Sequence, residues 1–462
     1  MSGGTLTAVV LVYGFALWLG LYLIVRDPRS PALLLTGLGL AAYALALACD
    51  LLADATPTSE GLEWVREPLL LLPALLWTGA LIHLLPEEVS YRDRLARLWS
   101  VAGTLVAVLI LLVSFGLGWI KSSVPPGGLV PFVFGGVVLT PMLALVCFVW
   151  WSLRGRRVRE VAGVLAVVTL FLTLSTALVL SPLDWIPRFL VLLALGLDLI
   201  LLGLAIAYFD AFGQGEALLP DMVRSFDAAF LAALVFGGQV ALAIVVATGP
   251  ILPMLVLLLA TVATAVVVPT FSDALSAALD RLALLPSVRR TRSELRQAAS
   301  ALPRTNPELD PTTLDETEFA RLTRRALSNF GDLPRLFTSP LINLVLITDR
   351  LAARGAADDA IGRAAELKSV LAESIARLKP RVDEDFGTSD EWRYYNALYF
   401  PYVVGLKPYG SRDRTKPTDP ASREALEWFR ARVPERTLRN WQNAAAKLVA
   451  RDLLARNGSF PE

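Results

Sequence analysis

The chain has 462 residues, of which 55% are hydrophobic, and its mean hydropathy is +0.55. Soluble domains are typically about 45–50% apolar, so this composition indicates a membrane protein. The only two cysteines, Cys49 and Cys147, lie within apolar stretches, which excludes a disulfide framework and a thiolate-rich metal site.

Charged residues divide the chain into two regions that suit different solvents. Of the 43 Lys and Arg residues, 13 precede Asp280 and 30 lie beyond it, whereas the 42 Asp and Glu residues divide as 17 and 25. The first region is compatible with lipid hydrocarbon, and the second carries a net charge of +5. The sequence therefore predicts a membrane region followed by a water-soluble region.

The membrane region contains nine apolar stretches long enough to cross a bilayer, which takes about 20 residues. They are 5–25, 31–53, 69–86, 99–120, 129–151, 161–180, 189–208, 227–248 and 251–272. If the N-terminus lies outside, the inner loops hold ten Lys or Arg residues and the outer loops hold three, namely Arg66, Lys121 and Arg188. This bias predicts a multi-pass protein of the bacterial inner (plasma) membrane, with its C-terminal region in the cytoplasm.

The first seven spans have short loops and no large outer domain, and the stretch "LIVRDPRSPALLLTGLGLAAYALAL" is typical of them. In this layout they resemble the seven-transmembrane sensory region at the N-terminus of some bacterial histidine kinases. The resemblance covers residues 5–226, and it implies that the region receives a signal and passes it to the cytoplasmic part. The last two spans depart from that pattern.

We therefore expect four segments. Residues 1–226 form the seven-span sensor-like region, which ends in a helix on the inner membrane surface. Residues 227–285 hold two further spans and a connecting helix, residues 286–316 form a linker, and residues 317–462 form an output domain.

Asp198 lies midway along the seventh span, where a carboxylate is costly and usually faces the interior of the bundle. The functional interpretation is a ligand or proton site. The structural alternative is a protonated or hydrogen-bonded packing contact.

The C-terminal region shows helical periodicity and no convincing alternating strand, so the whole protein is expected to be all-α. It contains no His and no Cys, and it lacks a P-loop and the motifs of a kinase. The "DEDFG" at Asp383–Gly387 is interpreted as a loop. We expect no catalysis, no metal site and no cofactor in this region.

The stretch "LEWFRARVPERTLRNWQNAAAKLV" predicts two helices joined by a tight turn at Pro434. Apolar residues Leu426, Phe429 and Val433 face a second stripe, which is formed by Leu438, Trp441, Ala445 and Leu448. The spacing resembles a helix-turn-helix of the transposase or response-regulator kind. Its second helix would present Arg436, Arg439, Asn440 and Asn443 to DNA bases, with Arg412 and Arg414 near phosphates.

Three functions follow from these features. The first is a membrane-bound sensor and transcriptional regulator whose partner is DNA. The second is a membrane scaffold whose helical domain binds a cytoplasmic protein, with Trp441 and Tyr394, Tyr395 or Tyr402 in an exposed apolar patch. The third is a transporter with a regulatory tail, which requires a cavity at Asp198. Membrane lipid and further copies of the chain remain open as partners.

Overall fold

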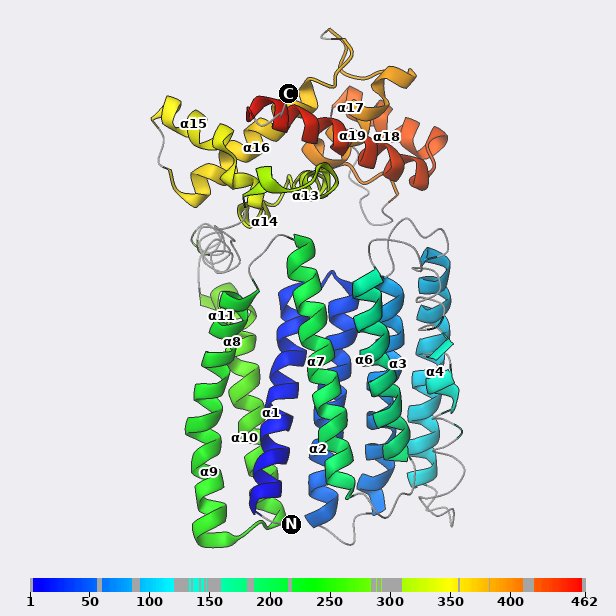
Figure 1. Cartoon of the computed structure of the whole chain (residues 1–462), viewed down its shortest axis with the longest axis vertical. Coiled ribbons are helices and arrows are strands. Elements are labelled where there is room, and N and C mark those ends of the chain that lie inside the picture. The colour runs from blue at the N-terminus through cyan, green and yellow to red at the C-terminus, as the bar shows by residue number, and fades with distance from the viewer. Residues whose placement is uncertain are drawn as a thin grey trace. The chain divides into compact units, whose positions relative to one another are not determined.

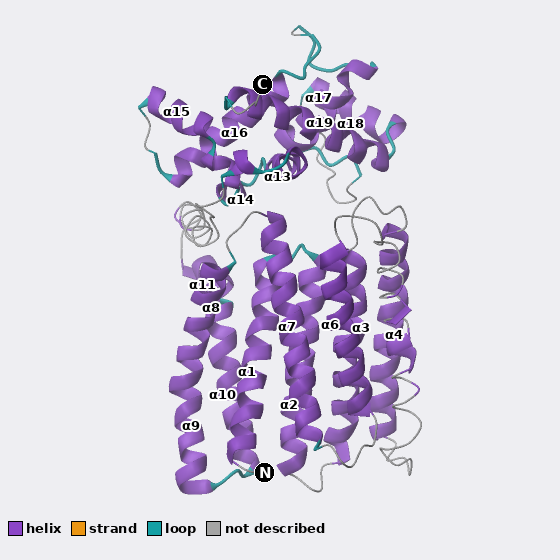
Figure 2. Cartoon of the chain, viewed as in Figure 1, coloured by secondary structure: helices purple, strands orange, loops and turns teal. Residues whose placement is uncertain are grey.

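The structure is a computed structural model. It describes residues 3–55, 60–84, 92–119, 159–180, 187–214, 218–283, 310–355, 358–381, 383–409 and 419–458, together with single residues or short runs between 133 and 147 and at 288 and 292. Every regular element in these ranges is a helix, in agreement with the all-α prediction (Figure 2). The chain forms two compact units, Met1–Phe209 with Met222–Asp280, and Asp210–Asp221 with Arg281–Glu462.

The first unit is a bundle of long helices that run up and down beside one another (Figure 1). Its first elements are α1 (Gly3–Arg26), α2 (Pro31–Ala55), α3 (Glu60–Leu84), α4 (Arg92–Trp119), α6 (Arg159–Leu180) and α7 (Arg188–Gln214). A helix with two π turns follows, made of α8 (Leu219–Ala232), η1 (Ala233–Gly237), α9 (Gly238–Ala243) and η2 (Ile244–Thr248). The last elements are α10 (Leu252–Thr270) and α11 (Ser272–Ala283).

Five of these helices are long and apolar enough to cross a membrane. They are Gly3–Arg26, Pro31–Ala55, Arg188–Tyr208, Leu219–Val246 and Leu252–Thr270. Shorter apolar helical segments occur at Leu69–Leu84 and Thr169–Leu178, within α3 and α6. The span predicted at 129–151 lies mostly outside the described residues. The composition of the described helices is that of a membrane protein, whereas the count of nine spans and their orientation stay predictions.

The helix expected on the inner membrane surface differs in the structure. Helix α7 continues to Gln214, and a second helix runs without a break from Leu219 to Thr248. The charged residues Asp221, Arg224 and Asp227 thus lie in the first turns of the same helix that contains the eighth predicted span, 227–248. Their charges favour a separate amphipathic helix when the sequence is considered alone. A spanning helix, however, commonly begins with charged residues at the membrane surface.

Small residues allow the close approach of α1 to α2. A Cβ atom at Gly37 would lie 2.5 Å from the carbonyl oxygen of Gly20, and one at Gly20 would lie 2.8 Å from that of Gly37. The two backbones are therefore in direct contact. Such contacts are the usual basis of helix packing in membranes, where lipid removes the hydrophobic driving force between helices.

The second unit contains several short helices and two longer ones. Its described elements are η4 (Pro311–Thr313), α13 (Glu316–Ser328), α14 (Leu333–Phe337), η5 (Pro340–Asn343), α15 (Val345–Arg354), α16 (Ala360–Ala376), η6 (Asp390–Trp392), α17 (Arg393–Leu398), η7 (Tyr399–Val404), α18 (Pro420–Arg432) and α19 (Glu435–Arg456). Asp383–Gly387 lies in a loop, as predicted.

Side-chain caps explain where three of these helices begin. The Asp315 carboxylate accepts a hydrogen bond from the backbone N–H of Glu318, and Asp359 and Asp419 do the same at the starts of α16 and α18. Such caps satisfy donors that have no partner within the helix. Helix α15 ends at Gly355, whose φ of 60° a residue with a side chain rarely adopts.

Helix α19 is the central element of this unit. Its C-terminal half contributes Ala445, Ala446, Val449, Ala450 and Leu453 to the larger of the two apolar cores that it reaches, which also includes residues of α13, α15, α16 and α17. Its first turns contribute Leu438 to a smaller core with α18. One helix therefore joins both cores.

Candidate functional site

The predicted helix pair is present, and its turn is as short as expected. Helix α18 ends at Arg432 and α19 begins at Glu435, with Val433 and Pro434 between them. Proline favours an extended conformation in the residue before it, so the first helix ends there. The Leu438 N–H donates to the Pro434 carbonyl at 3.1 Å, which closes the first turn of α19.

The apolar residues of the pair agree in part with the predicted stripes. Phe429, Val433 and Leu438 are buried together in the smaller core, and Trp441 packs against that core. Ala445 is buried in the larger core instead. Leu448 is 36% exposed and does not complete the stripe.

Three of the four predicted base-reading residues are exposed. They are Arg436, Arg439 and Asn440, all within the first two turns of α19. The Arg439 guanidinium donates to the Glu435 carboxylate at 2.8 Å, a pair in which both side chains are more than half exposed. Exposed pairs of this kind hold a side chain weakly, so phosphate can compete for Arg439.

Asn443 differs from the prediction. Its side chain is partly buried, and its Oδ1 atom is enclosed without a hydrogen-bond partner in the described part of the chain. It is therefore less accessible to a ligand than Arg436, Arg439 and Asn440. Arg412 and Arg414 lie outside the described residues.

Comparison of the chain with protein families, curated proteins and solved structures finds no match.

Further exposed charges flank the three residues. Arg430 and Arg432 end α18, and Lys447 continues the outer face of α19. Two acids on α18, Glu424 and Glu427, are exposed as well. Over the described residues of the two helices, the excess of basic side chains suits an anionic ligand.

The four aromatic residues expected in an exposed patch of a scaffold are buried or partly buried, namely Tyr394, Tyr395, Tyr402 and Trp441. Tyr395 is buried, and its ring stacks on that of Tyr399 at 4.9 Å. Trp441 stacks on Trp428 at 5.9 Å and is only partly exposed. Tyr402 packs against the larger core. These rings serve internal packing.

An ion-pair network fixes α15, α16 and α19 to one another. The Glu366 carboxylate, whose side chain is 4% exposed, lies 2.8 Å from Arg350 and 2.7 Å from Arg354. Glu373 accepts two hydrogen bonds from Arg350 and one from Arg456. The hydrogen bonds from Arg350 are the largest cause that lowers the pKa of Glu373, which falls to about 2.

This network predicts loss of stability in acid. Because the pKa of Glu373 is lowered on folding, its contribution is complete above about 4.5, its ordinary value, and is lost as the pH falls towards 2. Thermal unfolding of the second unit, monitored by hydrogen exchange in α16, should show a midpoint temperature that decreases as the pH falls through this interval. The Glu373→Gln variant should be less stable at neutral pH and should flatten the dependence. An unchanged pH profile would contradict the prediction.

In the first unit, Asp198 accepts a hydrogen bond from the hydroxyl of Ser175 on α6, at 2.5 Å. Asp198 itself lies on α7 and is partly buried. This contact links two neighbouring helices in mid-span, as the packing interpretation expects. The cavity described below does not have Asp198 in its lining.

Sequence analysis missed a buried ion cluster at the end of α2. The Asp50 carboxylate accepts hydrogen bonds from Arg66 at 3.0 Å and from Arg188 at 3.1 Å, and its side chain is 12% exposed. Two of the three basic residues expected in outer loops thus neutralise one carboxylate. The signal available in the sequence was that each of these two arginines lies shortly before an apolar span.

Proposed function

We propose that the chain is a membrane-bound regulator without catalytic activity, in which the bundle receives a signal and the helical unit binds DNA in the cytoplasm. The observation that carries the proposal is the exposure of Arg436, Arg439 and Asn440 in the first turns of α19, directly after a two-residue turn. Recognition helices present their N-terminal residues to the major groove in this way.

The chemistry of these side chains supports the proposal. Arginine makes paired hydrogen bonds to guanine, and asparagine does so to adenine. The helix that bears them is held rigidly, because its other end is buried in the larger core. A rigid element positions such contacts better than a loop does.

Binding of duplex DNA by the full chain in detergent micelles tests the proposal. A fluorescent duplex of random sequence should bind, and three phosphate contacts would weaken binding about 40-fold between 50 and 200 mM salt. The Arg436→Ala/Arg439→Ala variant should weaken binding at low salt and reduce the slope of log affinity against log salt by about 2.

A matched control removes the same charge elsewhere. Arg335 and Arg381 lie on other elements, where they form ion pairs with nearby acids, Asp332 and Glu384. The Arg335→Ala/Arg381→Ala variant should keep the affinity and the salt slope. Equal losses in both double variants would mean that binding reflects net charge alone, and no binding at low salt would leave the helix pair as a surface for a protein partner.

A further inference from the structure

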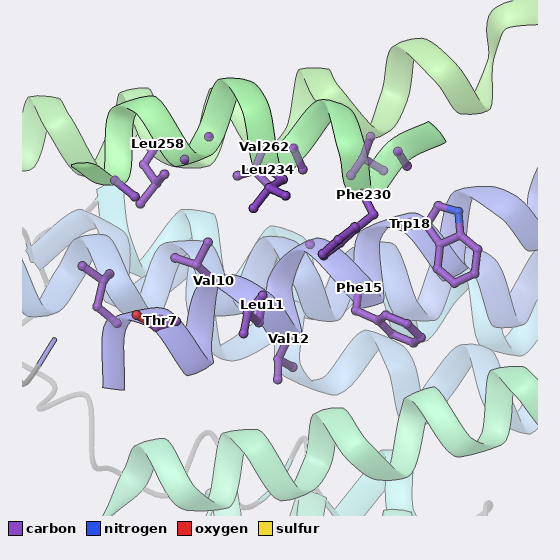
Figure 3. A pocket seen from close by; sticks show the side chains of 18 of the residues that line it. Thr7, Val10, Leu11, Val12, Phe15, Trp18, Phe230, Leu234, Leu258 and Val262 are labelled. Carbon is purple, nitrogen blue, oxygen red and sulfur yellow. The ribbon is translucent and has the colours of Figure 1, made fainter. Parts of the chain in front are cut away.

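A cavity of about 600 Å³ lies in the first unit between α1, α10 and the helix that contains α8, η1, α9 and η2. In Figure 3, Phe230 and Leu234 lie on the opposite side of the cavity from Val10, Leu11 and Phe15 of α1. Its volume falls within the range of small-molecule sites, about 300–1,000 Å³. The cavity is therefore large enough for a ligand.

The lining of the cavity is almost entirely hydrocarbon. Among the lining residues that the structure describes, Thr7 and Trp18 alone have a side chain with a polar group. The Thr7 hydroxyl donates to the Gly3 carbonyl, and the Trp18 indole N–H donates to the Ser225 hydroxyl. Both groups already have partners, so a polar ligand would lose its hydrogen bonds to water without replacement. The lining suits an apolar chain.

The cavity is also long. Along α1 it extends from Gly3 to Trp18, which at 1.5 Å per residue is about 22 Å. Both π turns, η1 and η2, contribute to its wall. Such turns are rare and often occur at functional sites. This length exceeds the hydrocarbon thickness of one leaflet, about 15 Å, and accommodates one extended acyl chain.

One end of the cavity lies at the edge of the hydrocarbon. Beyond Asp227 the helix runs through Thr248 without another charged residue, and these 21 residues span about 31 Å, close to the thickness of a bilayer core. Phe226 lines the cavity at this end, where its ring contacts Trp18 at 4.9 Å. Headgroups would therefore lie near Arg224.

Arg224 offers the charge that a phosphate needs. It is exposed two residues before Phe226, it lies outside the lining of the cavity, and it makes no ion pair with any residue in the described ranges. Asp227, one turn further on, is exposed too, while Asp221 on the other side makes a further interaction. An arginine three residues from an exposed carboxylate complements a zwitterionic headgroup, in which a phosphate is joined to an ammonium group.

We propose that this cavity binds a phospholipid, with one acyl chain between α1 and α9 and the phosphate at Arg224. The inference goes beyond the proposed regulator and does not depend on DNA binding. A bound lipid would make the packing of the eighth and ninth predicted spans against α1 sensitive to the surrounding bilayer.

Photolabelling tests the proposal in the full chain. The protein is reconstituted in vesicles of phosphatidylethanolamine and phosphatidylglycerol, with a trace of phosphatidylethanolamine that carries a diazirine midway along one acyl chain. After irradiation, peptide mapping should place the label on the residues of the cavity. Gly238 lines the cavity, and a Cβ added there meets nothing within 4 Å, so a side chain at this position starts in open space and Gly238→Phe should fill the cavity. Labelling there should fall about tenfold, because the ring displaces methylene groups of the chain.

Three further variants make the test specific. Ala260→Phe adds the same ring on an exposed face of α10 outside the cavity and should leave the label unchanged. Val245 lines the cavity and is 82% exposed, so Val245→Trp can also fill the cavity. This variant replaces Gly238→Phe if Gly238→Phe does not fold. Arg224→Gln should reduce labelling by the phospholipid but not by a diazirine fatty acid.

Other outcomes would overturn the proposal. Equal labelling of all lipid-facing helices, or no effect of either filling variant, would show that the cavity holds no particular lipid. If the phospholipid labelled Arg224→Gln and the unmodified protein equally, Arg224 would not bind the phosphate of the headgroup. Cross-links between two copies at the cavity, without lipid label, would assign it to a dimer interface.

Discussion

Replacement of Gly37 by valine is expected to separate α1 from α2 and to destabilise the bundle severely. A Cβ atom at this position would lie 2.5 Å from the Gly20 carbonyl oxygen and 2.7 Å from a side-chain carbon of Ile24. Overpacking a core usually costs about 1–3 kcal/mol, because side chains can shift. Here the nearest atom belongs to a backbone, so we expect a loss at or above the upper end of that range.

The measurement is the fraction of protein that remains monodisperse in detergent after heating. The Gly37→Val variant should lose its folded fraction at a much lower temperature than the unmodified chain. Gly238→Ala is the matched control, because a Cβ there meets nothing within 4 Å and alanine favours a helix by about 1 kcal/mol over glycine. If both variants unfolded at the same temperature as the unmodified chain, the close contact of α1 with α2 would be wrong.

The sequence predicted those parts of the fold that depend on local patterns. Helix α13, Glu316–Ser328, is one such part, because Asp315 caps it and its apolar residues recur on one face. The turn at Pro434 was predicted from the restriction that proline places on its neighbours. Both features are encoded within a few residues.

The remaining features depend on neighbours that are distant in sequence. Helical spacing placed Asn443 on the outer face of α19, but that helix continues into a core shared with α13 and α17, which leaves Asn443 partly buried. Asp50 meets Arg66 and Arg188, which are 16 and 138 residues away. The π turns beside the cavity shift the helical register in a way that an apolar sequence does not reveal. Periodicity identifies a face but not what packs against it.

Replacement of Glu366 by alanine is expected to cause the largest loss in the second unit. The carboxylate is almost fully buried, and it lies within 3 Å of both Arg350 and Arg354. Its removal leaves two guanidinium groups close together, and only Arg350 retains a second carboxylate, that of Glu373. Removing one partner of a buried ion pair typically costs about 3–5 kcal/mol. The loss here should lie near or below the lower end of that range, because the Arg354 side chain is 55% exposed and Arg350 keeps Glu373.

Hydrogen exchange in α15 and α16 of the full chain measures this loss directly, because both helices depend on the network. Amide protons there should exchange far faster in Glu366→Ala, whereas helices of the first unit should keep their protection. Glu384→Ala breaks an exposed pair with Arg381 and should change little, since solvent already screens those charges. Similar exchange in the two variants would mean that Glu366 is solvated in solution. The contrast follows from burial alone: the two glutamates make ion pairs of nearly the same length, 2.8 and 3.0 Å, yet only Glu366 is removed from water.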